Sequence, residues 1–481
     1  MFPGLTLAYW LTVHGLVTIV AVLVYAITAH VLQQRRHPTA AIAWVLFILL
    51  MPYLALPAFL TFGSRKQARP RNRHALGRPP CDADGPWAIQ TALALGQPEP
   101  AAYRELQLHA DGAEALAALW QTIDAAEHTI DLCTFIIGRD AIGHGLMERL
   151  AAKARAGVRV RLMLDGLGSL MRSRPSLAPL RAAGAQVTLF VPPLHSPLKG
   201  RTNLRDHRKM LVADAGLPTR RLWCGGRNLA CEYFEGLGGA APWRDLTFDL
   251  RGAFVDQASA LFAHDWSFAN GRRRLARAAV HDHARLRAGA APFDEPAGDT
   301  PATDACAQLV ASGPDQVDDT VYSLLVTAAY RARHRIALST PYFVPDASLL
   351  TALCLAARRG VQVDLLLPAR SNHRLSDVAR RRALRALALA GARIWLTADM
   401  QHGKCAVIDA TLALAGSANL DSRSLFLNYE LMVAFHDADA VTRFAAWFER
   451  ERGRATAFAP RRAGLVADVA EGLVLWLGFQ L

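Results

Sequence analysis

Paired cysteines are missing from this sequence of 481 residues. Its seven cysteines are scattered singly, whereas zinc sites and redox motifs place cysteines in Cys-x2-Cys pairs. A Gly-x4-Gly-Lys-Ser/Thr loop for nucleotide phosphates is missing as well. These absences exclude the zinc-finger, thiol-redox and P-loop classes of protein. We expect the cysteines to be small buried residues in a reducing compartment.

Charged residues are missing from two long stretches near the N-terminus. Residues 1–34 and 40–62 contain no Lys, Arg, Asp or Glu, and each stretch is long enough to cross about 30 Å of hydrocarbon as a helix. A cleaved signal peptide would need a basic start and a shorter apolar run. We therefore predict a two-helix transmembrane hairpin over residues 1–65, rather than a buried hairpin of a soluble protein. The cations at 65–73 outnumber the two in the turn between the helices, which predicts that the remainder of the chain lies in the cytoplasm.

Acidic residues are too few to balance the basic ones. Lys and Arg number 54 against 41 Asp and Glu, which gives a formal net charge of +13. This balance favours an anionic partner, either nucleic acid or acidic lipid, although an Arg-rich composition alone gives the same sum. The sequence has no strip of interleaved basic and aromatic residues, and its apolar N-terminus favours lipid. We therefore predict anionic membrane lipid as the partner, and no nucleic acid.

An internal repeat organises the rest of the chain. Residues 129–165 and 335–368 both read as an apolar strand, a loop, an amphipathic helix, Gly-Val and a second apolar strand. Alternating strands and helices predict an α/β fold of two similar halves, each with a largely parallel, covered sheet. The predicted boundaries are a linker over 66–103, a first half over 104–275, a second linker over 276–305 and a second half over 306–481.

One polar motif occurs once in each half. RDHRKMLVAD and MQHGKCAVID both place His, then Lys two positions later, then Asp five positions after the Lys. Residues two apart in a strand project from the same face, so the motif predicts an imidazole and an ammonium side by side on a strand that ends at the Asp. If the halves pack about a pseudo-two-fold axis, both pairs converge on one pocket. The candidate catalytic residues are His207, Lys209, Asp214, His402, Lys404 and Asp409.

Such a pocket suits a phosphodiester. Two lysines offset its negative charge, and Asn228 and Asn419 can donate hydrogen bonds to its non-bridging oxygens. One neutral histidine can attack phosphorus to form a phosphohistidine, while the other, protonated, donates to the departing alcohol. A metal site is not expected, because Lys is a poor ligand and no carboxylate or thiolate stands beside either histidine. Three carboxylates could orient a histidine or lysine, or serve only solubility: Glu232, Asp245 and Glu430.

The paired motifs resemble those of the phospholipase D superfamily, and their surroundings resemble the membrane-anchored bacterial cardiolipin synthases. The resemblance rests on LRDHRKMLVAD, GGRNLACEYFEG and PWRDLTFDLRGAFV in the first half, on STPYFVPD, QHGKCAVID and GSANLDSRSLFLNYEL in the second, and on HPTAAIAWVLFILLMPYLALPAFLTFGSRK near the N-terminus. It implies a multi-pass enzyme of the bacterial inner membrane with two phospholipase-D-like repeats and a cytoplasmic catalytic part. It also implies that two phosphatidylglycerol molecules react through a phosphatidyl-histidine to give cardiolipin and glycerol, without a cofactor. By the same resemblance, His207 is the nucleophile and His402 the acid and base.

The chain departs from the family pattern in two places. The segment from the motif Asp to the first Gly of Gly-Gly-x-Asn or Gly-Ser-x-Asn is four residues longer in the first half, which places an insertion in the turn AGLPTRR. Arg205 and Asp206 stand where the family more often has Arg-Asn.

Neighbouring reactions stay open at this point. A hydrolytic phospholipase D would use the same side chains with water as acceptor, and a phosphatidyltransferase could use another alcohol. A superfamily nuclease and a lipid-binding scaffold without catalysis agree less well with the paired motifs and the apolar N-terminus. The sequence also leaves the oligomeric state open.

Overall fold

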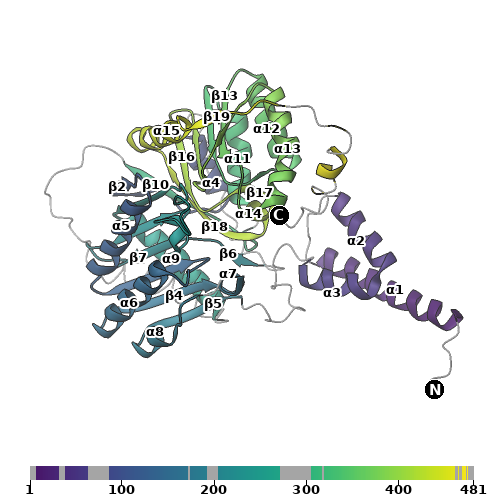
Figure 1. Cartoon of the computed structure of the whole chain (residues 1–481), viewed down its shortest axis with the longest axis horizontal. Coiled ribbons are helices and arrows are strands. Elements are labelled where there is room, and N and C mark those ends of the chain that lie inside the picture. The colour runs from purple at the N-terminus through teal and green to yellow at the C-terminus, as the bar shows by residue number, and fades with distance from the viewer. Residues whose placement is uncertain are drawn as a thin grey trace.

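Figure 1 shows the structure, a computed structural model of the chain. It describes residues 7–31, 38–62, 86–171, 174–191, 204–270, 305–316, 319–460, 464, 468–472 and 474. Much of the first predicted linker, nearly all of the second, and the cations beside the N-terminal helices lie outside these residues. The described chain forms two α/β halves and a group of N-terminal helices.

The first half is built on a seven-stranded sheet in the order β2-β9-β8-β7-β3-β4-β5. Its strands are β2 (Arg104–Leu108), β3 (Thr129–Thr134), β4 (Arg159–Asp165), β5 (Gln186–Phe190), β7 (Met210–Ala213), β8 (Arg221–Gly225) and β9 (Thr247–Arg251). Its helices are α5 (Gly112–Ala125), α6 (Ala141–Arg155), α7 (Gly168–Met171), α8 (Ala178–Ala182), the 3-10 turn η2 (Cys231–Tyr233) and α9 (Phe254–Ala269). Apolar faces of α5 and α6 pack on this sheet, with Leu119 and Leu146 fully buried.

The second half repeats this plan in a ten-stranded sheet, ordered β1-β10-β18-β16-β15-β11-β13-β14-β19 with β6 paired to β18. Its strands are β1 (Ala101–Ala102), β6 (Arg205–Asp206), β10 (Cys306–Ser312), β11 (Arg335–Ser339), β13 (Gln362–Pro368), β14 (Arg393–Thr397), β15 (Cys405–Ile408), β16 (Leu412–Gly416), β18 (Asn428–Phe435) and β19 (Ala455–Ala457). A separate pair joins β12 (Phe343–Val344) to β17 (Leu420–Asp421). The helices are α11 (Thr320–Arg331), α12 (Ala347–Arg358), α13 (Arg374–Leu389), α14 (Ser422–Phe426) and α15 (Ala438–Arg452).

The prediction of largely parallel sheets is wrong for most strands. Among the described strands, the parallel pairs are those within β3-β4-β5 and the equivalent β11-β13-β14, together with the short pairs β6-β18 and β12-β17. The strands that follow the His-x-Lys segments, β7 and β15, are antiparallel to both neighbours: each forms a hairpin with the next strand and runs opposite to β3 or β11. The hairpin turn is longer between β7 and β8 than between β15 and β16, which confirms the predicted insertion in the first half.

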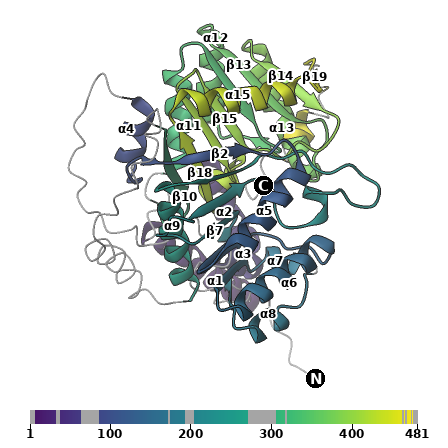
Figure 2. The same ribbon diagram turned by 90° about the vertical axis from the view of Figure 1, so that its left-hand side faces the viewer.

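The two halves share one hydrophobic core. Phe248 of β9 contacts Phe435 of β18 and Phe444 of α15, with ring centroids 5.5 and 6.0 Å apart. All three side chains are fully buried. Figure 2 shows the two halves meeting in the middle of the molecule, where β2, β10 and β18 are labelled. Because the core is continuous, side chains from opposite halves are held in fixed positions at the junction.

Part of the first predicted linker belongs to the folded body. The helix α4 (Trp87–Ala94) buries Ala88 against α11, and β1 pairs antiparallel with β10. The prediction of a linker as far as residue 103 is therefore wrong from Trp87 onward. An apolar stretch this short gives no helical period, but it can still be ordered by packing on a larger core.

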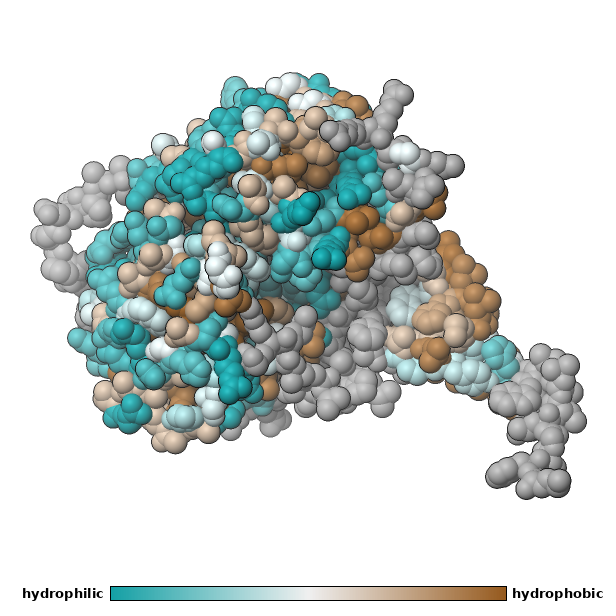
Figure 3. Space-filling model, in the orientation of Figure 1, coloured by the Kyte–Doolittle hydropathy of each residue, from teal (hydrophilic) through white to brown (hydrophobic). Residues whose placement is uncertain are grey.

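The N-terminal helices are α1 (Leu7–Val31), α2 (Pro38–Leu50) and α3 (Pro52–Phe62). They pack on one another around Tyr25, Ile48 and Phe59 and lie beside the two halves (Figure 1). Large apolar side chains such as Leu16 and Leu54 remain on their surface, which appears brown in Figure 3. Within the described part of the chain, no helix combines the length and the apolar character that crossing a membrane requires. The predicted membrane-crossing pair is therefore not confirmed.

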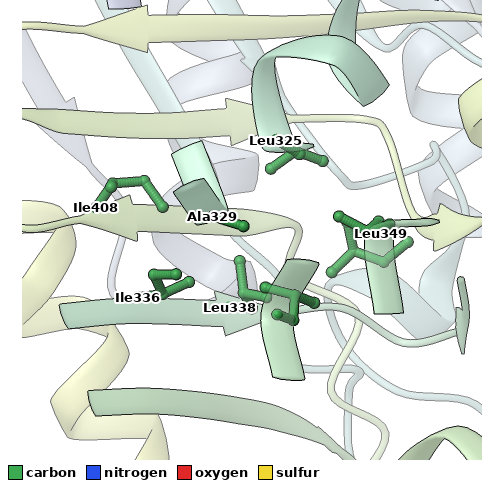
Figure 4. Close-up of a pocket in the computed structure, with 8 residues that line it drawn as sticks. Leu325, Ala329, Ile336, Leu338, Leu349 and Ile408 are labelled. Atoms are coloured by element: carbon green, nitrogen blue, oxygen red, sulfur yellow. The ribbon is translucent and has the colours of Figure 1, made fainter. Parts of the chain in front are cut away.

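A small cavity lies inside the core of the second half. Its volume is about 10 Å³, and Figure 4 shows the side chains around it. They are Leu325, Ala329, Ile336, Leu338, Leu349, Leu353, Ile408 and Leu420. A space of this size between apolar side chains is a packing gap, because it offers a water molecule no polar partner.

Candidate active site

A carboxylate from the second half holds His207. The Nδ1 atom of His207 lies 3.0 Å from the carboxylate of Glu430, which is fully buried on β18. The hydroxyls of Ser417 and Ser424 donate to the same carboxylate, at 2.6 and 2.9 Å. A carboxylate at Nδ1 assigns the Nδ1–H tautomer to the neutral ring, so Nε2 carries the lone pair.

A carboxylate from the first half holds His402 in the same way. The Nδ1 atom of His402 lies 2.6 Å from Oδ2 of Asp245, which is fully buried. The two histidine–carboxylate pairs therefore cross between the halves in opposite directions. The structure brings both predicted histidines to this junction, together with two of the three predicted supporting carboxylates.

Backbone hydrogen bonds between the halves fix the two histidines as well. The His207 N–H donates to the carbonyl of Tyr429 (2.9 Å), and the His402 N–H donates to the carbonyl of Arg244 (2.6 Å). Both His-x-Lys segments precede their strands, β7 and β15, so the prediction that they lie within a strand is wrong. The reason is that each histidine bonds to the opposite half and not to its own sheet.

Each lysine lies beside the histidine of its own motif, and its ammonium group points at the backbone carbonyl of that histidine. The Nζ atom of Lys209 donates to the His207 carbonyl (2.6 Å), and that of Lys404 donates to the His402 carbonyl (2.5 Å) and lies 3.0 Å from Nε2 of His402. Burial lowers the pKa of Lys209 to about 8 and that of Lys404 to about 7. Asp245 and Glu430 both oppose this shift at both lysines, which indicates that the two motifs share one electrostatic environment.

Both histidines are neutral at neutral pH. Burial and the charge of Lys404 lower the pKa of His402 to about 3, although Asp245 acts in the opposite direction. Burial also lowers the pKa of His207, against the pull of Glu430. Burial alone would raise the pKa of Asp245, but Lys404 and His402 bring it below its ordinary value, so this carboxylate stays ionised.

The predicted phosphate donors lie on the loops after β8 and β16. Asn228 bonds to the hydroxyl of Tyr233 (2.7 Å), and the amide oxygens of Asn228 and Asn419 are buried without a hydrogen-bond partner among the described residues. Exchanging the two ends of the Asn228 amide keeps the bond to Tyr233, with the hydroxyl as donor, and frees the amide N–H groups. Both side chains can then donate to an anion at the junction.

The structure places the motif aspartates away from the histidines, at the far ends of β7 and β15. Asp214 accepts hydrogen bonds from the backbone N–H groups of residues 127–129 (2.8 to 2.9 Å), and Asp409 does the same for residues 333–335. Both adopt a left-handed backbone with φ of 49°. Their carboxylates therefore fasten the start of β3 and β11, and they have no contact with the reacting centre.

Glu232, the third predicted supporting carboxylate, lies on η2 and lines a separate pocket with Trp243.

Sequence reasoning missed the aromatic residues next to the histidines. Tyr233 and Trp243 contact the ring of His402, with centroids 5.2 and 5.4 Å away, and Phe135 contacts that of His207 at 5.3 Å. Tyr233 follows Glu232 directly in the chain, but nothing in the spacing of an aromatic residue distinguishes a contact to the site from ordinary core packing.

Comparisons with known proteins agree with this geometry. A family model described as "Cardiolipin synthase, PLD-like domain" matches residues 119–266 and 325–452, and one described as "Phospholipase_D-nuclease N-terminal" matches residues 17–64. The cardiolipin synthase A of Klebsiella pneumoniae is 31% identical over 464 residues, which cover 92% of this chain and 90% of that protein. The enzyme of the same name from Escherichia fergusonii is 30% identical over 455 residues, which cover 90% of this chain and 88% of that protein. A phosphatidylserine synthase structure from Haemophilus influenzae shares the fold, with a TM-score of 0.58 at 12% identity, over 80% of this chain and 96% of that one.

The geometry of Asp214 predicts an effect on stability. Replacing Asp214 by Ala removes three backbone hydrogen bonds to an ionised group and leaves a left-handed residue without a polar side chain, so we expect a loss of about 3 kcal/mol in the free energy of unfolding. Asp214→Asn keeps one acceptor oxygen and tolerates this backbone, so it should lose less. Fluorescence-monitored urea unfolding in detergent measures both, and equal stability of the Ala variant and the parent would contradict the assignment.

Proposed function

This chain belongs to the cardiolipin synthase family of phospholipase-D-like proteins, and from that premise we propose that it transfers a phosphatidyl group from one phosphatidylglycerol to another with release of glycerol. One observation carries the proposal: two histidines, each bonded at Nδ1 to a carboxylate of the opposite half, meet where two lysines and two asparagines supply positive charge and hydrogen-bond donors. This arrangement supplies a nucleophile, an acid and an anion site without further groups.

In the first step, Nε2 of His207 attacks the phosphorus of the first phosphatidylglycerol. The P–N bond forms as the P–O bond to glycerol breaks, and Nε2 of His402 gives its proton to the departing oxygen. His402 is neutral in the free site, so it takes up this proton when the negatively charged phosphodiester enters beside it. Asp245 at Nδ1 stabilises the imidazolium that forms.

In the second step, the roles of acid and base reverse. A hydroxyl of the second phosphatidylglycerol gives its proton to Nε2 of His402, and its oxygen attacks the phosphorus. The P–N bond to His207 breaks, and the histidine returns to its neutral form. One phosphodiester replaces another, so the exchange needs no nucleotide or other energy source.

Lys209 and Lys404 offset the charge of the phosphodiester in both steps, and Asn228 and Asn419 donate to its non-bridging oxygens. Burial strengthens these interactions, because water does not screen them there. It also brings the lysine pKa values close to neutral pH, so the charge that binds the phosphate depends on pH.

We also propose that the N-terminal helices hold the enzyme at the bacterial inner membrane, with both halves on the cytoplasmic side. The uncharged stretches 1–34 and 40–62, the apolar side chains exposed on α1, α2 and α3, and the lipid nature of the substrate support this placement. An enzyme whose substrates lie in a bilayer gains from being held there, because attachment raises the local concentration of lipid at the site.

The pKa values predict a bell-shaped dependence of kcat/KM on pH. Above about pH 7 to 8 Lys404 and Lys209 lose their protons, so the site loses positive charge and binds phosphate less well. On the acid side His207 gains a proton and cannot attack, and because its pKa is lowered this limb lies below pH 6.5. Initial rates in detergent micelles, with circular dichroism to confirm folding at each pH, measure the profile. An activity that keeps rising to pH 9 would contradict the role of the lysines.

The proposed reaction is tested with phosphatidylglycerol as the only lipid in detergent micelles. We expect cardiolipin and free glycerol in equal amounts from the parent, and a loss of several orders of magnitude in His207→Ala, in His402→Ala and in the double variant alike, because the two histidines act as a unit. Chromatography of radiolabelled products separates cardiolipin, phosphatidic acid and glycerol. Formation of phosphatidic acid without cardiolipin would contradict the proposed transferase and indicate a hydrolase.

A further inference from the structure

A pocket of about 390 Å³ opens beside the proposed catalytic centre, on the side of His402. Its lining residues are Glu232, Leu237, Ala240, Ala241, Trp243 and Asn372. All but Asn372 belong to one segment of the first half, which runs from η2 to the loop before β9, and Asn372 comes from the loop before α13. The pocket therefore lies at the junction of the two halves, like the histidines.

Aromatic rings connect this pocket to His402. The ring of Trp243 lies 5.4 Å from that of His402 and 4.7 Å from that of Tyr233, which in turn lies 5.2 Å from His402. Backbone hydrogen bonds also link the pocket to His402. The N–H of Trp243 donates to the carbonyl of Glu232 (2.7 Å), and the carbonyl of the next residue, Arg244, accepts from the His402 N–H. A molecule in the pocket thus lies against the same tryptophan that contacts the proposed acid and base.

The lining favours a neutral molecule with hydroxyl groups. Glu232 is the one ionisable residue of the lining, and its side chain is buried, with 6% of the residue exposed. A carboxylate accepts hydrogen bonds from hydroxyls and repels phosphate. Asn372 adds a second polar group, anchored where its oxygen accepts from the hydroxyl of Tyr342 (2.5 Å). The remaining lining is apolar and suits the carbon chain of a small polyol.

The direction of attack places the alcohol on this side. The attacking and leaving groups lie on opposite sides of the phosphorus during phosphoryl transfer. With His207 bonded to phosphorus, the alcohol oxygen lies on the far side, where His402 exchanges its proton. The pocket lies against Trp243, whose ring contacts that of His402.

We propose that this pocket is the alcohol subsite of the transfer, in which Glu232 accepts a hydrogen bond from a glycerol hydroxyl that does not react. The inference rests on the proposed function. The subsite holds the glycerol that leaves in the first step and the glycerol headgroup that attacks in the second. As that headgroup attacks, its reacting O–H gives the proton to Nε2 of His402, the new P–O bond forms and the P–N bond to His207 breaks. By holding an alcohol beside the phosphohistidine, Glu232 favours transfer over attack by water.

Glycerol exchange tests the subsite directly. In micelles of phosphatidylglycerol, radiolabelled glycerol enters the lipid by reversal of the first step, and its concentration dependence reports binding at the alcohol subsite. We expect Glu232→Gln to raise the glycerol concentration for half-maximal exchange by about tenfold or more, since a hydrogen bond to a charged group is lost. The ratio of phosphatidic acid to cardiolipin should rise in the same variant. Glu235→Gln, three positions along the same segment but exposed to solvent, is the matched control and should behave as the parent.

The outcomes separate the subsite from the overall function. A parent that exchanges glycerol and makes cardiolipin, with an unchanged half-maximal concentration in Glu232→Gln, would overturn the subsite alone. A parent that yields only phosphatidic acid would overturn the proposed function and the subsite with it. Glu232→Asp keeps the carboxylate and serves as the control for misfolding. We expect it to form phosphatidic acid at the parental rate and to bind glycerol better than Glu232→Gln. Loss of all activity in both variants would indicate a structural role and overturn the inference.

Discussion

The hydrogen bonds from His207 to Glu430 and from His402 to Asp245 are the constraint on which the rest of the structure depends. Each joins a histidine of one half to a carboxylate of the other, so neither half holds a complete site. The shared aromatic core and the backbone bonds to Tyr429 and Arg244 keep these partners in register. Burial of these ion-forming groups is tolerable only because every one faces an opposite charge or a hydrogen-bond donor.

The two halves have diverged within this common plan. The middle residue of His-x-Lys is Arg208 in the first half, where it is fully buried and paired with Asp265. Its counterpart is Gly403, where a β-carbon would come within 2.7 Å of the Trp447 ring. Burial lowers the pKa of both histidines, and the pocket lined by Trp243 lies on the side of His402. The two similar halves thus surround their histidines with different side chains.

Much of this site could be predicted from sequence, because two copies of one motif at matching places in an internal repeat indicate equivalent positions in the two halves. The two α/β halves are confirmed, and the structure places Glu430 and Asp245 at Nδ1 of His207 and His402. The structure places Asp214 on backbone N–H groups and not at the histidines, because a motif shows that a residue recurs but not whether it bonds a ligand or the backbone. Strand direction and the pocket beside Trp243 depend on which distant segments meet, and no local pattern encodes that.

The most direct test of the account is to trap the covalent intermediate. The parent enzyme is mixed with phosphatidylglycerol labelled in its phosphate, quenched within one turnover in alkaline denaturant that preserves phosphohistidine, and digested for mass spectrometry. The account predicts a phosphatidyl or phosphoryl group on His207 and none on His402. Modification of His402, or no covalent lipid on either histidine while cardiolipin still forms, would contradict it.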